Sequence, residues 1–396
     1  MDISLLRIVY EFAPGIGGSI THIIELSEKI DNLLSDQVVI APDHPNAARS
    51  DGEFGFEVIR VPIKAYGILR RVPSRALVQL SYSMSVVTQI QRICSSGRSF
   101  DILHVHGPLL GSFIRFFLKM KSIKIPIIEM SHGGYGENGQ QNTIASGRFN
   151  KLLTRVLIRL FPADSYLALD DGTGVEILHK TVRNINKEYT VVYHGIDTDI
   201  FSPISEDTSP ESDGLFRILF PHRIIPFKRP DIALEVLKIL INRYNIVNIE
   251  IVFLANDEER MQIQEQARIN DLCDHVRFES RKKPLEMIRM YTTCDVVIGT
   301  SIISNLNRAI QEAMACEKAI IIFDSGNLNG FITNTNGILV KNGDINGFVE
   351  ALWKLYQEPD LRVSIGKEAR ITILRERSWK KRIDAELNVY ESILTK

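Results

Sequence analysis

The sequence predicts an α/β protein built from doubly wound parallel sheets. Short apolar segments alternate with amphipathic segments along most of the 396 residues, which is the pattern of strands covered by helices. A polar segment rich in Pro, Ser and acidic residues, 202–214, interrupts the alternation before it restarts. Such a composition is typical of a linker, and the chain length suits two domains better than one core.

The expected elements follow from this alternation. In the first half, strands are predicted at Leu6–Tyr10, Gln37–Ala41, Ile102–His106, Ile125–Met130, Tyr166–Leu169 and Thr190–Tyr193, with helices between them, for example at Ser19–Leu34 and Ser85–Cys94. In the second half, strands are predicted at Arg217–Phe220, Glu250–Leu254, Val276–Phe278, Val296–Ile298 and Ala319–Phe323.

These elements predict two Rossmann-like domains, residues 1–200 and 215–377, joined by a linker at 201–214. Ligands of such sheets bind beyond the carboxyl ends of the strands. We therefore expect a ligand in the cleft between the two domains.

Composition excludes several classes of function. The formal net charge is −1, so no nucleic-acid partner is indicated. The cysteines Cys94, Cys273, Cys294 and Cys316 have no metal-binding spacing, and we expect buried free thiols in a reducing compartment. With no secretory signal and no apolar run of transmembrane length, a cytoplasmic protein is predicted.

The segment Gly299–Cys316 is the most informative one. A strand ends in small polar residues and a helix follows, so free backbone N–H groups converge where an anion can bind. Ser301, Ser304 and Asn305 can each cap that helix. Glu312 lies inside it and can reach back toward the strand ends.

Glycines follow the first predicted strand. Gly15, Gly17 and Gly18 precede a helix that carries His22 in its first turn, and glycine lets the backbone approach a ligand closely. The spacing is not a dinucleotide fingerprint. A tight turn between strand and helix is the simpler explanation of these residues taken alone.

Histidines mark two other strands. His104 and His106 lie on one face of a strand, and His104 fits a buried core histidine. His132 ends a strand and precedes glycines, which favours a position in the ligand cleft. No third ligand completes a zinc site, so no metal is predicted.

A basic loop follows the first strand of the second half. Arg223 and Lys228 flank it before a helix that starts near Pro230. Fixed cations at a helix entrance can neutralise a diphosphate and stabilise it as a leaving group. A solvated basic loop is the alternative, and the two readings weigh equally.

A basic amphipathic helix is predicted at residues 148–161. Lys151, Arg155 and Arg159 form a stripe opposite leucine and valine side chains. The helix can rest on an anionic membrane surface or pack on the core with a solvated basic face. Arg70 and Arg71, in a second basic loop, favour membrane contact slightly.

Taken in order, these sites resemble the retaining nucleotide-sugar glycosyltransferases of family 4 (group 1), which have the GT-B fold. The resemblance is carried by Pro14–His22, Asp101–Gly107, Ser131–Gly133, Val192–Pro203, Arg223 with Lys228, Glu312–Ala315 and Ser378–Trp379. It covers nearly the whole chain and implies an interdomain cleft. It also implies that the final helix, 378–396, packs back on the first domain.

The resemblance implies roles for the site residues. Arg223 and Lys228 would bind the diphosphate, with Gly17 and Gly18 beneath it, and Glu312 would bind the ribose hydroxyls. His132 would face the reacting sugar. The backbone of Asn305, Leu306 and Asn307 would meet the pyrophosphate or the sugar. The implied reaction is glycosyl transfer with retention and without a bound metal or other cofactor, the nucleotide-diphosphate sugar being a co-substrate.

Several positions depart from the family pattern. Ser304 stands near the place of a usual glutamate that contacts the donor sugar, while His222 and Arg229 replace glycines of the phosphate signature. The family also usually has a glycine-rich strand end where this chain has Phe253–Asn256. A hydroxyl at position 304 gives a weaker contact than a carboxylate. Arg308 can pair with Glu312, which is a structural alternative for that acid.

The predicted function is transfer of a sugar from a nucleotide-diphosphate sugar to a glycan, a lipid-linked acceptor or a glycolipid. The protein is expected in the cytoplasm, with peripheral contact at the inner face of the membrane. The alternative is a non-catalytic relative that binds a nucleotide sugar or a partner enzyme, which Ser304 favours and the retained Arg223, Lys228 and Glu312 disfavour. A sugar-nucleotide epimerase of the same fold is a weaker third possibility.

Overall fold

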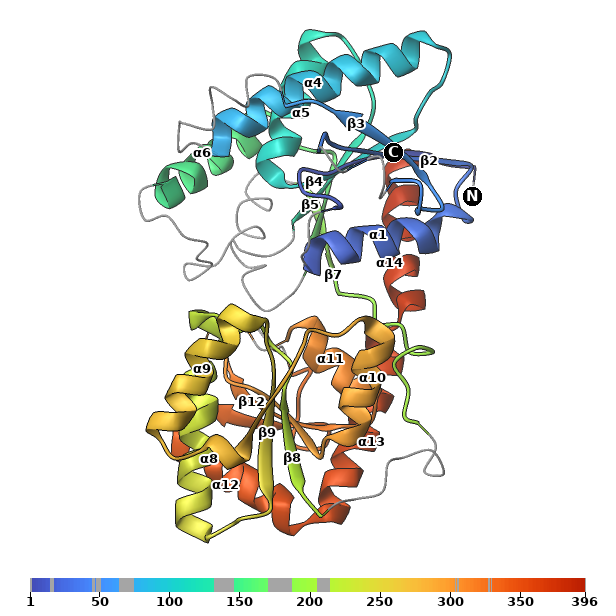
Figure 1. The fold of residues 1–396 in the computed structure, drawn as a ribbon. Helices are drawn as coiled ribbons and strands as arrows, with labels where there is room; N and C mark the ends of the chain where they lie inside the picture. Colours follow the sequence, from blue (N-terminus) through green and yellow to red (C-terminus); the bar gives the residue numbers. More distant parts are fainter. Residues whose placement is uncertain are drawn as a thin grey trace. The chain divides into compact units, whose positions relative to one another are not determined.

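The fold is given by a computed structural model, shown in Figure 1. It describes residues 2–14, 18–44, 47, 51–63, 75–131, 146–169, 187–204, 214–302, 304, 306–326, 328 and 330–395. Contacts divide the chain into two compact units. The first contains residues 1–170, 174–194 and 382–396, and the second contains residues 171–173 and 195–381.

The first unit is built on a parallel sheet. Its described residues form seven strands in the order β3-β2-β1-β4-β5-β6-β7. The strands are β1 (Ser4–Ile8), β2 (Asp36–Pro42), β3 (Glu57–Val61), β4 (Ile102–His106), β5 (Ile127–Ser131), β6 (Ser165–Leu169) and β7 (Glu188–Val192). The helices are α1 (Gly18–Asp31), α4 (Arg75–Ser95), α5 (Pro108–Met120), α6 (Ser146–Leu160) and α14 (Trp379–Leu394).

Helices cover both faces of this sheet. One apolar core joins the strands to α4, α5 and α6, with Tyr82, Val86 and Ile114 fully buried. The other core includes Ile30 of α1 and Tyr390 of α14. The last helix of the chain is therefore part of the first unit's core.

The second unit repeats the architecture. Its described residues form six parallel strands in the order β10-β9-β8-β11-β12-β13. The strands are β8 (Phe216–Phe220), β9 (Ile249–Leu254), β10 (Val276–Glu279), β11 (Val296–Gly299), β12 (Ala319–Asp324) and β13 (Ile338–Lys341). The helices are α8 (Pro230–Tyr244), α9 (Asp257–Ile269), α10 (Pro284–Thr293), α11 (Arg308–Ala315), α12 (Ile345–Gln357) and α13 (Pro359–Glu376), with short 3-10 helices η2 (Pro226–Lys228) and η3 (Cys273–His275).

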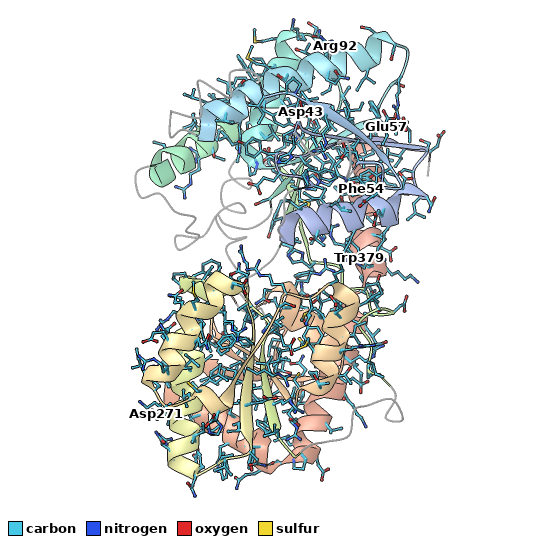
Figure 2. The ribbon with its side chains drawn as sticks, viewed as in Figure 1. Asp43, Phe54, Glu57, Arg92, Asp271 and Trp379 are labelled. Carbon is cyan, nitrogen blue, oxygen red and sulfur yellow. The ribbon has the colours of Figure 1, made fainter. Side chains whose placement is uncertain are left out.

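Two layers of helices enclose the second sheet. Helices α8, α9 and α12 cover one face, and α10, α11 and α13 cover the other (Figure 1). Gly366 of α13 lies so close to the chain turn at Glu317 that an added Cβ would be 2.0 Å from the Glu317 carbonyl oxygen. At the other end of the unit, Gly195 lies against the ring of Trp379, which Figure 2 labels.

The predicted fold class is confirmed, and each predicted strand is present with ends shifted by at most two residues. Strands β3 and β13 were not predicted. Both lie at sheet edges and are only partly buried; the apolar run of β3 is interrupted by Arg60, and that of β13 is only Ile338–Val340. The expectation of buried thiols is correct for Cys294 and Cys316 but wrong for Cys94 and Cys273, which are exposed on a helix end and a connecting turn.

Candidate functional site

The second sheet has a topological switch point between β8 and β11. The chain runs from β8 through β9 to β10 at one edge and then returns to β11 on the other side of β8. The connections after β8 and β11 therefore leave in opposite directions at the carboxyl edge, which is where sheets of this type bind ligands. Arg223 and Lys228 follow β8, and residues 300–307 follow β11. The two sequence regions predicted to bind an anion thus flank one switch point.

A buried hydroxyl fixes the loop that carries Lys228. Thr300, at the end of β11, is fully buried. Its Oγ1 lies 2.9 Å from the Lys228 carbonyl oxygen and 2.8 Å from that of Arg229, so the hydroxyl donates to this pair of carbonyls. Sequence reasoning missed this residue, because a threonine after a strand has many explanations.

The cations of this loop differ in their surroundings. Arg229 adopts a left-handed backbone conformation, with φ of 52°, and its guanidinium forms a close ion pair with Asp231, 2.7 Å from Nη2 to Oδ2. Arg223 is exposed, whereas Lys228 is half-buried with its Nζ 5.3 Å from the centre of the Phe227 ring. Arg229, which replaces a family glycine, is thus engaged locally by its own helix.

His222 joins the two strand ends. Its side chain is buried and bonds the backbone of Ile298 in β11. Burial, and secondarily the neighbouring Lys228 ammonium, hold the pKa of His222 well below its usual 6.5. The ring is therefore neutral at physiological pH and adds no charge to the Arg223–Lys228 loop.

The segment after β11 is folded back by side-chain hydrogen bonds. Asn307 caps α11 by accepting from the Ile310 backbone N–H at 3.4 Å, so capping by Ser301, Ser304 or Asn305 was the wrong expectation. Ser301 instead accepts from the Ser304 backbone N–H, and its own carbonyl receives the Ser325 hydroxyl at 2.7 Å.

Glu312 is held by interactions at each of its carboxylate oxygens. The residue is 8% exposed. Arg308 Nε lies 2.7 Å from Oε1, and the Tyr291 hydroxyl lies 3.1 Å from Oε2. The pairing with Arg308 was foreseen as a structural alternative, whereas Tyr291, on a different helix, was not.

The other predicted site residues are distributed as follows. Ser304 and Leu306 are buried in the segment before α11, and Asn307 is its cap. Gly18 is the first residue of α1 in the first unit. His132, Gly17 and Asn305 lie outside the described residues, as do Arg70, Arg71 and the linker core at 205–213.

In the first unit, His104 and His106 belong to the core. Their rings stack with centroids 4.6 Å apart, which confirms that they share one strand face. His104 Nδ1 lies 2.8 Å from the Tyr390 hydroxyl, and Arg7 Nη1 lies 3.0 Å from His106 Nε2. Burial lowers the pKa of His104 to about 4 despite the adjacent Glu386. The prediction of a buried core histidine is confirmed, although only its Nδ1 is hydrogen-bonded and Nε2 has no partner among the described residues.

Neither a metal site nor a membrane-spanning helix is found among the described residues. No group of three or more His, Cys, Asp and Glu side chains there has the arrangement of a metal site. None of the helices in that part of the chain combines the length and apolarity needed to cross a membrane.

Comparison with known proteins identifies the family. Residues 16–200 match the model of glycosyltransferase family 4, and residues 203–372 match that of glycosyl transferases group 1. A D-inositol 3-phosphate glycosyltransferase of Corynebacterium jeikeium is 24% identical over 75% of this chain and 73% of its own length. An uncharacterised glycosyltransferase of Methanocaldococcus jannaschii is 21% identical over 97% of each chain.

Solved structures have the same fold. A glycosyltransferase of Rickettsia africae superposes with a TM-score of 0.75 at 17% identity, covering 99% of each chain. Anabaena HepE, solved in complex with UDP, gives a TM-score of 0.74 at 14% identity over the full length of both chains. With its family 4 segment followed by a group 1 segment on two parallel-sheet units, the chain belongs to the GT-B glycosyltransferases of family 4 and group 1.

Proposed function

We propose that this glycosyltransferase takes a sugar from a nucleotide-diphosphate donor and transfers it with retained anomeric configuration, without a bound metal or other cofactor. The observation that carries the proposal is the β8–β11 switch point, where the Arg223–Lys228 loop follows one strand and the helix that holds the anchored Glu312 follows the other. Structures of Anabaena HepE with UDP and with UDP-glucose support the donor class.

In this proposal each side chain has one task. Arg223 and Lys228 neutralise the diphosphate, and Glu312 accepts hydrogen bonds from the ribose. Backbone groups at Asn305, Leu306 and Asn307 meet the pyrophosphate or sugar, with Ser304 beside them. Gly17 and Gly18 let the first unit's backbone approach the diphosphate, and His132 faces the sugar.

The proposed step exchanges one bond to the anomeric carbon for another. The bond from that carbon to the diphosphate oxygen breaks, and a bond to the acceptor hydroxyl oxygen forms on the same face. The acceptor proton passes to a leaving diphosphate oxygen. The developing negative charge on that oxygen is stabilised by Arg223 and Lys228, so the fixed cations lower the barrier.

The acceptor is proposed to be a glycan, a lipid-linked glycan or a glycolipid at the inner face of the membrane. Helix α6 supports membrane contact. Its apolar residues were expected to lie opposite the basic stripe, but Leu152, Val156 and Leu160 are exposed by 61%, 43% and 59%. They share one face with the exposed Arg155 and Arg159, while Leu153 and Leu157 pack inward. An apolar face bordered by cations suits an anionic bilayer surface.

A donor screen tests the core of the proposal. A panel of nucleotide-diphosphate sugars is compared by thermal shift, because a ligand that binds only the folded state raises the melting temperature. The expected result is stabilisation by one donor, release of its nucleoside diphosphate with a suitable acceptor, and a retained configuration in the product by NMR. Donor binding without turnover across acceptors would support the non-catalytic alternative, and an inverted product would contradict retention.

The cations are tested by charge removal. Arg223→Ala and Lys228→Ala are expected to lower kcat at least about 100-fold, the scale for losing one preorganised electrostatic contact. Lys238→Ala, on α8 with its Nζ bonded to Asn270, is the matched control and should keep full activity. Unchanged turnover in Arg223→Ala and Lys228→Ala, with the fold retained, would remove the diphosphate role.

Ser304 is tested by restoring the acid of the family pattern. If position 304 meets the donor sugar, Ser304→Glu changes the ranking of donors or their KM. The same ranking and the same KM values would place this residue outside the sugar site.

Membrane contact is tested by sedimentation with vesicles of phosphatidylglycerol and phosphatidylcholine. Neutralising Lys151, Arg155 and Arg159 should reduce binding to the anionic vesicles, by about 1 kcal/mol for each cation near the surface. A control replaces exposed Arg268 of α9, which pairs with Glu265. Equal sedimentation of wild type and the triple variant would contradict the membrane proposal.

A further inference from the structure

Tyr291 of α10 approaches the proposed ribose-binding acid from a separate helix. Its side chain is fully buried. The hydroxyl lies 3.1 Å from Glu312 Oε2 and 3.1 Å from the Ala309 carbonyl oxygen. A phenol has a single proton, so it donates to one of these acceptors at a time. No role in donor binding follows for Tyr291 from the sequence, because it stands 21 residues before Glu312.

The protonation state of Tyr291 suits a hydrogen-bond donor. Burial, and then the adjacent Glu312 carboxylate, raise the pKa of the Tyr291 phenol well above its usual 10.0. The phenol therefore stays protonated at every pH used in an assay. Its hydrogen bond to an ionised carboxylate is charge-assisted and stronger than one between neutral groups.

Two anchors define the plane of the carboxylate. Arg308 Nε holds Oε1 at 2.7 Å from within α11, and Tyr291 holds Oε2 from α10. A carboxylate that is held at one oxygen can still rotate about its Cγ–Cδ bond, whereas contacts on both oxygens restrict that rotation. A ribose presents two neighbouring hydroxyl donors, and accepting both requires a carboxylate plane that is already set.

We propose that Tyr291 is a positioning residue that orients Glu312 to accept both ribose hydroxyls, and that it thereby sets the preference for ribonucleotide over deoxyribonucleotide donors. This inference rests on the proposed function. Tyr291 lies outside the loops at the strand ends, and removal of its buried hydroxyl is expected to weaken the preference for ribonucleotides.

The experiment combines removal of the Tyr291 hydroxyl from the protein with removal of one ribose hydroxyl from the nucleotide. UDP, ADP, GDP and CDP are titrated calorimetrically into the wild type, and the tightest binder is compared with its 2′-deoxy and 3′-deoxy forms. The wild type should lose about tenfold or more in affinity for each deoxy form, the scale of one hydrogen bond to a charged group. In Tyr291→Phe that loss should shrink to about threefold, because the carboxylate no longer holds the pose.

Controls separate positioning from general stability. Tyr356→Phe removes another phenol hydroxyl of the second unit, one that donates to Asn248 at 2.8 Å, and it should keep the wild-type discrimination. The double variant Glu312→Gln/Tyr291→Phe should discriminate between ribo and deoxy forms no differently from Glu312→Gln alone. If Tyr291 acts through Glu312, its removal has no further effect once that carboxylate is gone, so the two effects are not additive. A merely structural tyrosine would weaken ribo and deoxy forms equally.

The outcomes are distinct. Discrimination that shrinks in Tyr291→Phe and is retained in Tyr356→Phe supports the inference. Wild-type discrimination that persists in a folded Tyr291→Phe overturns the inference and leaves the proposed function standing. Binding of none of the four nucleoside diphosphates to the wild type overturns both.

Discussion

The two units share one topology but place their charges differently. In the first unit, charged and polar groups lie within the sheet itself: Arg7 of β1 is in register with His104 of β4, and both are buried under α14. In the second unit, the equivalent neighbours β8 and β11 pair through apolar residues such as Ile218 with Val296. The charges within this sheet, on Arg217, Glu250 and Arg277, pair with one another and are partly exposed, whereas Arg223 and Lys228 come after β8 ends.

This difference separates structural charges from candidate ligand contacts. A charge within a sheet must find its partner inside the protein, and here Glu386 and Tyr390 of α14 provide it. A charge beyond a strand end remains within reach of a ligand. The same topology therefore holds an internal anchor in one unit and the candidate ligand contacts in the other.

The sharpest test removes Glu386. Its carboxylate is fully buried and contacts Arg7, Arg382, His104 and Tyr390. Glu386→Ala leaves buried cations without their anion, so the first unit should lose about 3–5 kcal/mol of stability. Far-UV circular dichroism during urea unfolding follows both units, while fluorescence of Trp353 follows the second unit once Trp379, the first residue of α14, is replaced by Phe in both proteins. Glu391→Ala, exposed on the same helix, is the control, and an equal effect of the two would contradict the anchor.

Glu129 gives a pH-dependent test within the first unit. The residue is 1% exposed, and neither carboxyl oxygen has a hydrogen-bond partner among the residues that the structure describes. Burial raises the pKa of Glu129 well above its usual 4.5, so the folded state holds a proton that the unfolded state releases. Its contribution to stability is full below pH 4.5 and falls as the pH rises, by about 1.4 kcal/mol for each pH unit.

Glu129→Gln removes this titration. Its stability relative to wild type should therefore increase as the pH rises from 4.5 toward the raised pKa of Glu129, by at most about 1.4 kcal/mol for each pH unit. The measurement is urea unfolding at each pH, with the exposed Glu53→Gln as control. A stability difference that does not change with pH would show that Glu129 is ionised in the folded protein.

Thr300 tests the loop in the second unit. Thr300→Val removes the hydroxyl that holds the Lys228 and Arg229 carbonyls, and it should cost about 1–3 kcal/mol of stability. The donor KM should rise as well, because the Lys228 loop loses its attachment to β11. Thr293→Val is the control, since that hydroxyl lies near the Arg289 and Met290 carbonyls of its own helix, α10. If Thr293→Val raises the donor KM equally, the loop attachment is not the cause.

The smallest effect is expected at Asp231. Asp231→Asn breaks the ion pair with Arg229, but these side chains are 48% and 36% exposed. The expected loss is at most about 1 kcal/mol, measured by urea unfolding in low and high salt. A larger loss would mean that this pair, and not Thr300, holds the Lys228 loop.

Much of the fold could be predicted from the sequence, because buried parallel strands have continuous apolar runs. The partly buried edge strands β3 and β13 have only short or interrupted runs, and the polar segment before α11 has several residues able to cap a helix. The Arg223 and Lys228 loop and Glu312 were found from the order of local patterns. Tyr291 and Thr300 were not, since each acts through a contact between segments far apart in the sequence.

The position of α14 also has a consequence for synthesis. Residues 382–396 complete the core of a unit that begins at the N-terminus. During translation, Arg7 and the strand histidines emerge long before Glu386, while the whole second unit is made in between. During synthesis the first unit therefore cannot complete its core or pair its buried charges until residues 382–396 are made. The second unit can fold before that point.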